Sequence, residues 1–258
     1  PLHYAAEWKL DQAVSVLLEK GANPNVRNAN GETPIFNAIK TDSTSTIDLL
    51  MKKGSEKNAR DYLGNTPLHA CVRWDSKNSA MKLIQWKADL DVQNLAGKTP
   101  LAQAARSGRM AMVTLLTENG ANIDATDATG KNVLIDAIQS GNIKIVSYLV
   151  KNGASPHIQE MYGRNAFHEV ALTGNKEMIT LIQKAGGNPL ARDTQGITPF
   201  SIVLERKDKE LILTAVRNKK AALKAVEPNG KLVYEKHAED GMTIAIAKRE
   251  WSVEFDET

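Results

Sequence analysis

Short apolar stripes at helical spacing recur along the chain and are separated by polar turns. Two clear examples are Met112, Val113, Leu115 and Leu116, and then Ile145, Val146, Leu149 and Val150. Residues at such spacings share one face of an α-helix, so each stripe predicts a short helix with one buried side. A helix of this length cannot bury its stripe alone. We therefore expect the helices to pack against neighbouring units in a solenoid.

The repeating unit is marked by six glycines that lie 33 residues apart: Gly31, Gly64, Gly97, Gly130, Gly163 and Gly196. A polar residue stands three positions before each glycine, which is typical of a tight turn with φ > 0 at the glycine. Two positions after each glycine is a residue type that caps helices: Thr33, Thr66, Thr99, Asn132, Asn165 and Thr198. Proline follows four of these caps, as in Thr33-Pro34, and favours the first helical position.

Each unit contains two predicted helices. In the later units the first helix is closed by Gly108, Gly141 or Gly174. The second helix is closed by Gly21, Gly54, Gly120, Gly153 and Gly186. The third unit departs from this pattern, because its second stripe of Ala80, Met81, Leu83 and Ile84 is displaced by one residue and Lys87 replaces the closing glycine. We expect a local irregularity there, which Trp86 covers from the outer side.

The segments that follow the turns have nearly the same sequence. Residues 66–71 read Thr-Pro-Leu-His-Ala-Cys and residues 99–104 read Thr-Pro-Leu-Ala-Gln-Ala. These segments and the 33-residue period resemble the ankyrin repeat family, whose signature is Thr-Pro-Leu-His-x-Ala. The resemblance runs from Pro1 to about Val216 and implies an all-α ankyrin-repeat solenoid of stacked helix-turn-helix units with hairpin loops. It also implies that His3, His69 and His168, which share one position, bridge neighbouring backbones.

The repeats divide the chain into three predicted parts. An ankyrin repeat array of seven repeats covers residues 1–217, and its first repeat enters already truncated at Pro1, so we expect a fragment of a longer array. Residues 218–240 are predicted to be an extension or insertion, and residues 241–258 a degenerate partial repeat or C-terminal cap. The alternation in residues 243–247 leaves a second possibility, a strand that pairs with residues 231–234. Of the two we favour the degenerate repeat.

Composition and charge narrow the function classes. The 33 basic residues are interspersed with 30 acidic ones and the net charge is +3, which argues against nucleic acid as a partner. The single cysteine, Cys71, rules out an intrachain disulfide framework and is expected to be a small core residue. No stretch reaches the roughly 18 to 20 apolar residues of a membrane span. The compartment stays open: the cytoplasm is the default, and secretion or a periplasmic location is compatible with a truncated N-terminus.

No group of side chains indicates catalysis. Asp124 and Asp127 lie three residues apart at a turn, but Asp91 and Asn94 repeat this spacing one unit earlier. This recurrence indicates turn chemistry and not a calcium loop or an acid/base pair. A glycine-rich phosphate-binding motif is also absent. We therefore predict no enzyme, no catalytic residue, no metal, no cofactor and no small-molecule substrate.

The remaining candidates are large side chains on the surface. In the ankyrin family partners are usually held on the concave side, by the turn tips and by outward residues of the first helices. Carried over repeat by repeat, this resemblance implies the partner-binding residues Tyr4, Trp8, Tyr62, Leu63, Arg73, Trp74, Leu95, Arg106, Met161, Tyr162 and Arg164. Aromatic and arginine side chains carry most interface energy. For Trp8 and Trp74, which occupy equivalent positions, packing against a neighbouring repeat is the alternative.

These observations predict a non-enzymatic protein-protein interaction scaffold that binds a partner protein or peptide on its concave face. The alternative is that the array is the regulatory or targeting region of a larger protein whose catalytic part lies outside this fragment. The sequence does not identify the partner.

Overall fold

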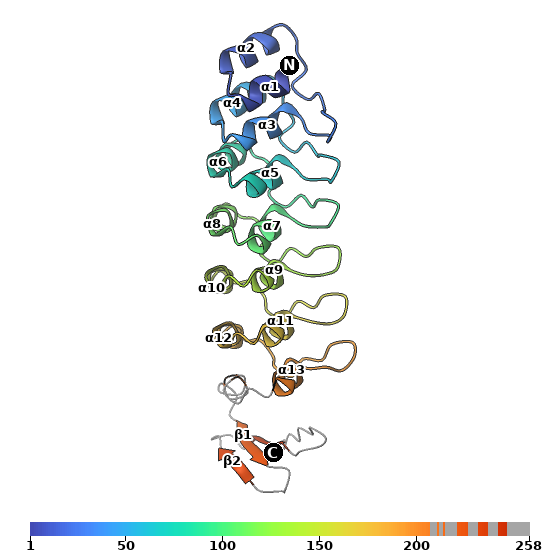
Figure 1. The fold of residues 1–258 in the computed structure, drawn as a ribbon, viewed down its shortest axis with the longest axis vertical. Helices are drawn as coiled ribbons and strands as arrows, with labels where there is room; N and C mark the ends of the chain where they lie inside the picture. Colours follow the sequence, from blue (N-terminus) through green and yellow to red (C-terminus); the bar gives the residue numbers. More distant parts are fainter. Residues whose placement is uncertain (207–210, 212–213, 215–220, 227–231, 237–241, 247–258) are drawn as a thin grey trace.

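A computed structural model of the chain describes residues 1–206, Leu211, Thr214 and three strands within 221–246. The predicted solenoid is confirmed for the array: helices stack in two rows, and a row of hairpin-like loops projects beside them (Figure 1). The first row contains α1 (Leu2–Glu7), α3 (Pro34–Lys40), α5 (Pro67–Trp74), α7 (Pro100–Arg106), α9 (Val133–Gln139), α11 (Ala166–Thr173) and α13 (Pro199–Glu205). The second row contains α2 (Asp11–Glu19), α4 (Thr44–Lys52), α6 (Lys77–Gln85), α8 (Met110–Glu118), α10 (Ile143–Lys151) and α12 (Lys176–Lys184).

The first-row helices begin at the predicted capping residues. Thr99 Oγ1 accepts a hydrogen bond from the backbone N–H of Ala102 at 3.2 Å, and Asn132 Oδ1 accepts one from Ile135 at 3.1 Å. Each bond satisfies an N–H group that has no partner inside its own helix. Thr33 has the same extended backbone, but its buried hydroxyl has no hydrogen-bond partner in the part of the chain that the structure describes.

The projecting loops, called fingers below, are held by the polar residue three positions before each repeat glycine. Asp61 Oδ1 accepts from the backbone N–H groups of Leu63 at 2.9 Å and Asn65 at 2.8 Å. Neighbouring fingers are joined through their backbones, as where Leu95 N–H donates to Leu63 O at 3.0 Å. Glycine is required because the fingers stack closely: Gly31 has φ +75°, and a Cβ there would lie 2.7 Å from the Tyr62 ring.

The backbone enters the left-handed region after each first-row helix. In repeats four to six the residue is a glycine, as predicted: Gly108, Gly141 and Gly174. Repeats one to three place Lys9, Asp42 and Asp75 at the same position, with φ between 51° and 56°. A left-handed conformation costs a non-glycine residue about 1–2 kcal/mol. Lys87, after α6, is likewise left-handed at φ 59° where the other second-row helices end in glycine, so the irregularity predicted there is confirmed.

The predicted displacement of the apolar stripe in the third repeat is wrong. The buried residues of α6 are Ser79, Ala80 and Leu83, which lie 33 residues before Met112, Val113 and Leu116 of α8. The helix therefore keeps the register of its neighbours, and Met81 is exposed instead of buried. A serine can occupy the core-facing position because its hydroxyl donates to Asp42 Oδ1 at 2.7 Å, so the polar group is not left unpaired.

One continuous core runs through the stack. It is built from leucine, isoleucine, valine and alanine side chains of both helix rows, with Phe36 and Phe167 as its largest fully buried members. Cys71 is fully buried in this core, as predicted, and burial raises the pKa of its thiol.

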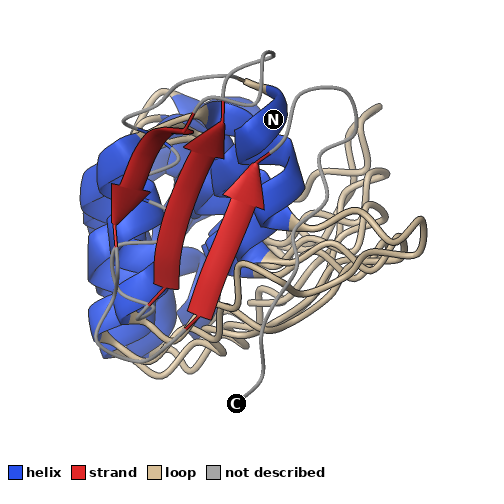
Figure 2. Ribbon diagram, turned by 90° about the horizontal axis from the view of Figure 1, so that it is seen from below, coloured by secondary structure: helices blue, strands red, loops and turns tan. Residues whose placement is uncertain are grey.

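The C-terminal segment contains strands and not the favoured degenerate helical repeat. The strands are β1 (Ala221–Val226), β2 (Leu232–Lys236) and β3 (Met242–Ile246), in the order β2-β1-β3 (Figure 2). β1 pairs antiparallel with β2 and parallel with β3, so the two predicted strand segments pair with a third strand and not with each other. The sequence analysis did not recognise β1. The extension predicted over 218–240 and the end of the chain lie partly outside the described residues, so the division into parts stays a prediction.

Candidate protein-binding surface

The exposed sides of the first-row helices and the adjoining finger tips form one surface, called the inner face below. It corresponds to the side on which the sequence analysis placed partner binding. The large apolar candidates on it are all exposed, from 49% for Trp74 to 75% for Leu95. Trp8, at 72%, and Trp74, at 49%, both keep a large exposed area, and the alternative that part of each ring packs against a neighbouring repeat stays a prediction.

Six of the predicted residues gather on repeats three and four. Tyr62 and Leu63 lie on one finger and Leu95 on the next, directly joined to Leu63 by the backbone hydrogen bond. Arg73 and Trp74 end α5, and Arg106 ends α7. These two repeats therefore carry three exposed apolar finger residues, together with two arginines and a tryptophan at the ends of their first-row helices. We call this set the central cluster: Tyr62, Leu63, Arg73, Trp74, Leu95 and Arg106.

The other predicted residues lie apart from the central cluster. Tyr4 and Trp8 belong to α1 and its C-cap at the N-terminal end of the stack. Met161 and Tyr162 form the exposed tip of a finger two repeats beyond Leu95. Arg164 is half-buried, and its Nε donates to Asp193 Oδ2 at 3.2 Å, so this arginine joins adjacent fingers.

The three equivalent histidines hold repeats together, as the resemblance implied. The Nε2 atoms of His3, His69 and His168 lie 3.0, 2.8 and 3.2 Å from a backbone carbonyl in the following repeat. Because a carbonyl can only accept, Nε2 carries the proton in each ring. Burial lowers the pKa of His69 to about 4 and lowers the pKa of His168, so both rings are neutral at pH 7.

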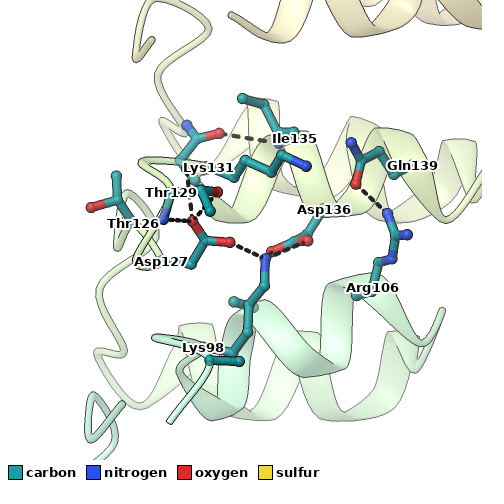
Figure 3. A network of polar contacts seen from close by, with 12 residues as sticks. Lys98, Arg106, Thr126, Asp127, Thr129, Lys131, Ile135, Asp136 and Gln139 are labelled. Carbon is teal, nitrogen blue, oxygen red and sulfur yellow. Dashed lines mark hydrogen bonds and ion pairs between the residues drawn. The ribbon is translucent and has the colours of Figure 1, made fainter. Parts of the chain in front are cut away.

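A charged network in the middle of the inner face was missed by the sequence analysis (Figure 3). Lys98 Nζ lies 2.8 Å from Asp127 Oδ2 and 2.6 Å from Asp136 Oδ2. Burial raises the pKa of Asp136, and the hydrogen bonds from Lys98 offset only part of that rise. The available signal was Asp136 itself, an acidic residue inside the apolar run 133–138 that needs a buried partner.

The outer side of the third repeat is closed by polar contacts that support the role predicted for Trp86. Trp86 Nε1 donates to Asp48 Oδ1 at 2.9 Å, and Lys82 Nζ lies 2.9 Å from Asp48 Oδ2. Further along the second row, α8, α10 and α12 form an open and mainly apolar groove of about 620 Å³ that was not predicted. Its floor includes Ile143, Tyr148 and Leu181.

Neither a metal centre nor a membrane span is found in the described part of the chain. Over those residues, no three His, Cys, Asp or Glu side chains are grouped so that they could hold a metal ion. None of the helices there combines the length and hydrophobicity needed to cross a bilayer.

Comparisons with known proteins agree with the repeat architecture. A family model described as "Ankyrin repeats (3 copies)" matches residues 2–94 and 78–160. Rabankyrin-5 of Homo sapiens is 54% identical over 41 residues, which are 16% of this chain and 4% of that protein. Rabankyrin-5 of Mus musculus is 47% identical over 47 residues, which are 18% of this chain and 4% of that protein. The matches thus span a small part of the length of these curated relatives.

Among solved structures, the ankyrin repeat domain of Bcl-3, described as a unique member of the IkappaB protein family, is similar over most of its length. The TM-score is 0.77 at 26% sequence identity, and the alignment covers 84% of this chain and 98% of that one.

Proposed function

Because the chain belongs to the ankyrin repeat family, whose repeats are generally protein-protein interaction modules, we propose that it is a non-enzymatic scaffold that binds a partner protein or peptide on its inner face. The central cluster carries this proposal. Tyr62, Leu63 and Leu95 are more than 60% exposed on the same two repeats that carry the arginines and Trp74. Tryptophan, tyrosine and arginine are the residues most often found at binding hot spots.

The chemistry of the remaining inner-face residues fits binding better than catalysis. The buried histidines are occupied in bridging repeats, and Lys98 is paired with both Asp127 and Asp136. The fully buried Cys71 thiol, whose pKa burial raises, is a poor nucleophile. The bridging histidines, Cys71 and the Lys98 network thus serve the architecture of the array, and the exposed side chains of its surface are left for recognition.

A second candidate is that the array is the regulatory or targeting region of a larger protein whose catalytic part lies outside this chain. The matched segments make up 4% of Rabankyrin-5, so similar repeat segments also occur inside a much longer chain. It is compatible with the first proposal, since a targeting array also acts by binding.

The test begins with capture of proteins from the source lysate by the wild-type chain and by a Tyr62→Ala, Trp74→Ala double variant. The captured protein is identified, purified and titrated against both. We expect the double variant to bind at least tenfold more weakly, because each hot-spot truncation costs about 1–4 kcal/mol. A Met81→Ala variant is the matched control, since Met81 is an exposed apolar residue on the opposite, second-row side. Equal affinities of all three proteins would contradict the proposal, once circular dichroism shows that each is folded.

A further inference from the structure

Three basic residues occupy one position of consecutive first-row helices. Lys40 ends α3, Arg73 precedes the last residue of α5 and Arg106 ends α7, and they are spaced by 33 residues. The helices α3, α5 and α7 follow one another along the stack (Figure 1), so these side chains form a column on the inner face. We call Lys40, Arg73 and Arg106 the basic column. Trp74 of the central cluster directly follows Arg73 at the end of α5.

The fold leaves the first two cations of this column weakly paired. Lys40 Nζ is 3.7 Å from Glu32 Oε2, and Arg73 Nη2 is 3.9 Å from Asp61 Oδ2, so neither pair is within hydrogen-bonding distance. Both carboxylates have other partners. Glu32 Oε2 accepts from Asn28 Nδ2 at 3.0 Å, and Asp61 accepts the two backbone bonds that shape its finger.

Arg106, the third member of the column, has no carboxylate partner among the described residues. One of its guanidinium N–H groups donates to the neutral Gln139 Oε1 (Figure 3). Gln139 Nε2 in turn donates to Glu169 Oε2 at 3.1 Å. The carboxylate of Glu169 is therefore bonded to the amide of Gln139 and not to Arg106. The guanidinium is exposed and keeps donors that the fold does not use.

The end of a first-row helix does not itself require a cation at this position. A basic residue in a last turn interacts favourably with the helix dipole, but only by about 0.3–1 kcal/mol at the surface. The helices α9, α11 and α13 form with Gln139, Leu172 and Glu205 at the equivalent positions. The three consecutive cations are therefore a property of this surface and not of the repeat.

The spacing of the column matches a particular peptide conformation. Helices packed side by side lie about 8–10 Å apart. A polyproline II segment has three residues per turn and rises about 3.1 Å per residue, so its side chains at i, i+3 and i+6 share one face at intervals of about 9 Å. We propose that the basic column binds an extended acidic segment of a partner protein, with Asp or Glu at every third residue.

This proposal rests on the proposed function and names the chemistry of the partner. Carboxylates at the three positions meet Lys40, Arg73 and Arg106, and each arginine presents a fork that fits a carboxylate. The residues between the carboxylates meet Trp74 and the finger tips, where apolar side chains or proline rings find aromatic and aliphatic surface. The exposed acid nearest in sequence to the column, Asp75, is paired with Arg109 at 3.1 Å and does not compete.

The test measures binding of fluorescent synthetic peptides to the whole chain by anisotropy. The phased peptide carries glutamate at i, i+3 and i+6 in a proline-rich background, and a permuted peptide of the same composition carries the glutamates at i, i+1 and i+2. We expect the phased peptide to bind at least tenfold more tightly, and an Arg73→Glu, Arg106→Glu variant to lose this preference. A Lys144→Glu, Lys151→Glu variant makes the same change of net charge on the exposed second-row side and is expected to keep it.

Three results would overturn the inference. They are equal binding of the two peptides, an equal loss of binding in both charge-reversal variants, and tighter binding of a single-stranded oligonucleotide than of the phased peptide. Failure of the inference is separable from failure of the proposed function. If the captured natural partner depends on Tyr62 and Trp74 but binds the Arg73→Glu, Arg106→Glu variant normally, the scaffold function stands and the acidic segment is wrong.

Discussion

On the inner face, Lys40, Arg73 and Arg106 of repeats two to four have no carboxylate within hydrogen-bonding distance, whereas Lys98 of repeat four and Arg164 of repeat six are each held by one or two. All five lie on the same face of the same repeat fold. Lys98 and Arg164 form ion pairs that join consecutive repeats. The cations of Lys40, Arg73 and Arg106 stay accessible to a partner. The repeat fold thus permits both uses, and the neighbouring side chains decide between them.

The strongest test of this difference is removal of Lys98. A Lys98→Met variant leaves Asp136 buried beside Asp127 without its cation, so we expect a loss of about 3 kcal/mol in the free energy of unfolding, measured in urea. Replacing both partners, as Lys98→Met with Asp136→Leu, should restore much of the loss, since two apolar groups need no pairing. A single variant as stable as the wild type would show that the network is not structural.

The bridging histidines stand in repeats one, three and six and should make the free energy of unfolding of the array depend on pH. Because the pKa of His69 is about 4 when folded and near 6.5 when unfolded, the unfolded chain binds more protons between these values. The stability contributed by neutral His69 is therefore complete above pH 6.5 and is lost as the pH falls toward 4.

A His69→Gln variant should lose on the order of 2 kcal/mol at pH 7 and show a flatter decline between pH 6.5 and 4. Chemical denaturation at several pH values measures this, with the exposed His157→Gln as control. An unchanged slope in the His69 variant would argue against the buried neutral ring.

The left-handed turn after α6 offers a milder change in the third repeat. A Lys87→Gly variant should raise the free energy of unfolding by about 1 kcal/mol, because glycine adopts this conformation without strain. The reciprocal Gly120→Lys variant at the equivalent turn should lower it by a similar amount, since a Cβ on Gly120 meets no atom within 4 Å and only the backbone strain is added. If both variants shift stability in the same direction, the strain argument is wrong.

The smallest effect on stability is expected for the basic column. Arg73→Met and Lys40→Met should each change the free energy of unfolding by less than about 0.5 kcal/mol, because each cation is partly exposed and beyond hydrogen-bonding distance, and each carboxylate keeps other hydrogen bonds. Compared with Lys98→Met, this sharpens the distinction between a cation that holds the fold and one that the fold leaves free. A loss in these variants comparable to that of Lys98→Met would remove the distinction.

The architecture of the array could be predicted from the sequence because its turns, helix caps and contacts between repeats each require a particular residue type. Glycine at the fingers, the capping Thr or Asn residues other than Thr33, and the shared histidines reappear in the roles expected. The turns at Lys9, Asp42 and Asp75 were not predicted, since φ > 0 is uncommon for non-glycine residues and, although Asp is enriched there, neither Asp nor Lys marks such a turn by itself. Comparison with the later glycines at the same position was the only signal.

The polar side of the site was less predictable. Ser79 was passed over as a core position because its burial depends on Asp42, which lies 37 residues earlier in the chain. The network of Lys98, Asp127 and Asp136 joins residues on two repeats, and the availability of Arg106 depends on Gln139 in the next repeat. Pattern reasoning along one repeat identifies exposed aromatic residues, but whether a charge is free or paired is decided between repeats.

The histidine bridges connect residues 29 positions apart, and so each of them ends in the adjoining repeat. The unit of evolutionary change in such a chain is therefore the whole repeat. Loss or duplication of one 33-residue repeat would leave each remaining histidine bonded to the repeat that follows it. Within repeats two to four, it would also remove or add one cation of the basic column. Insertion of a single residue early in one of the three helices would instead rotate the cation of that helix by about 100° away from the column, whereas a change of length by a whole repeat leaves the remaining cations in line.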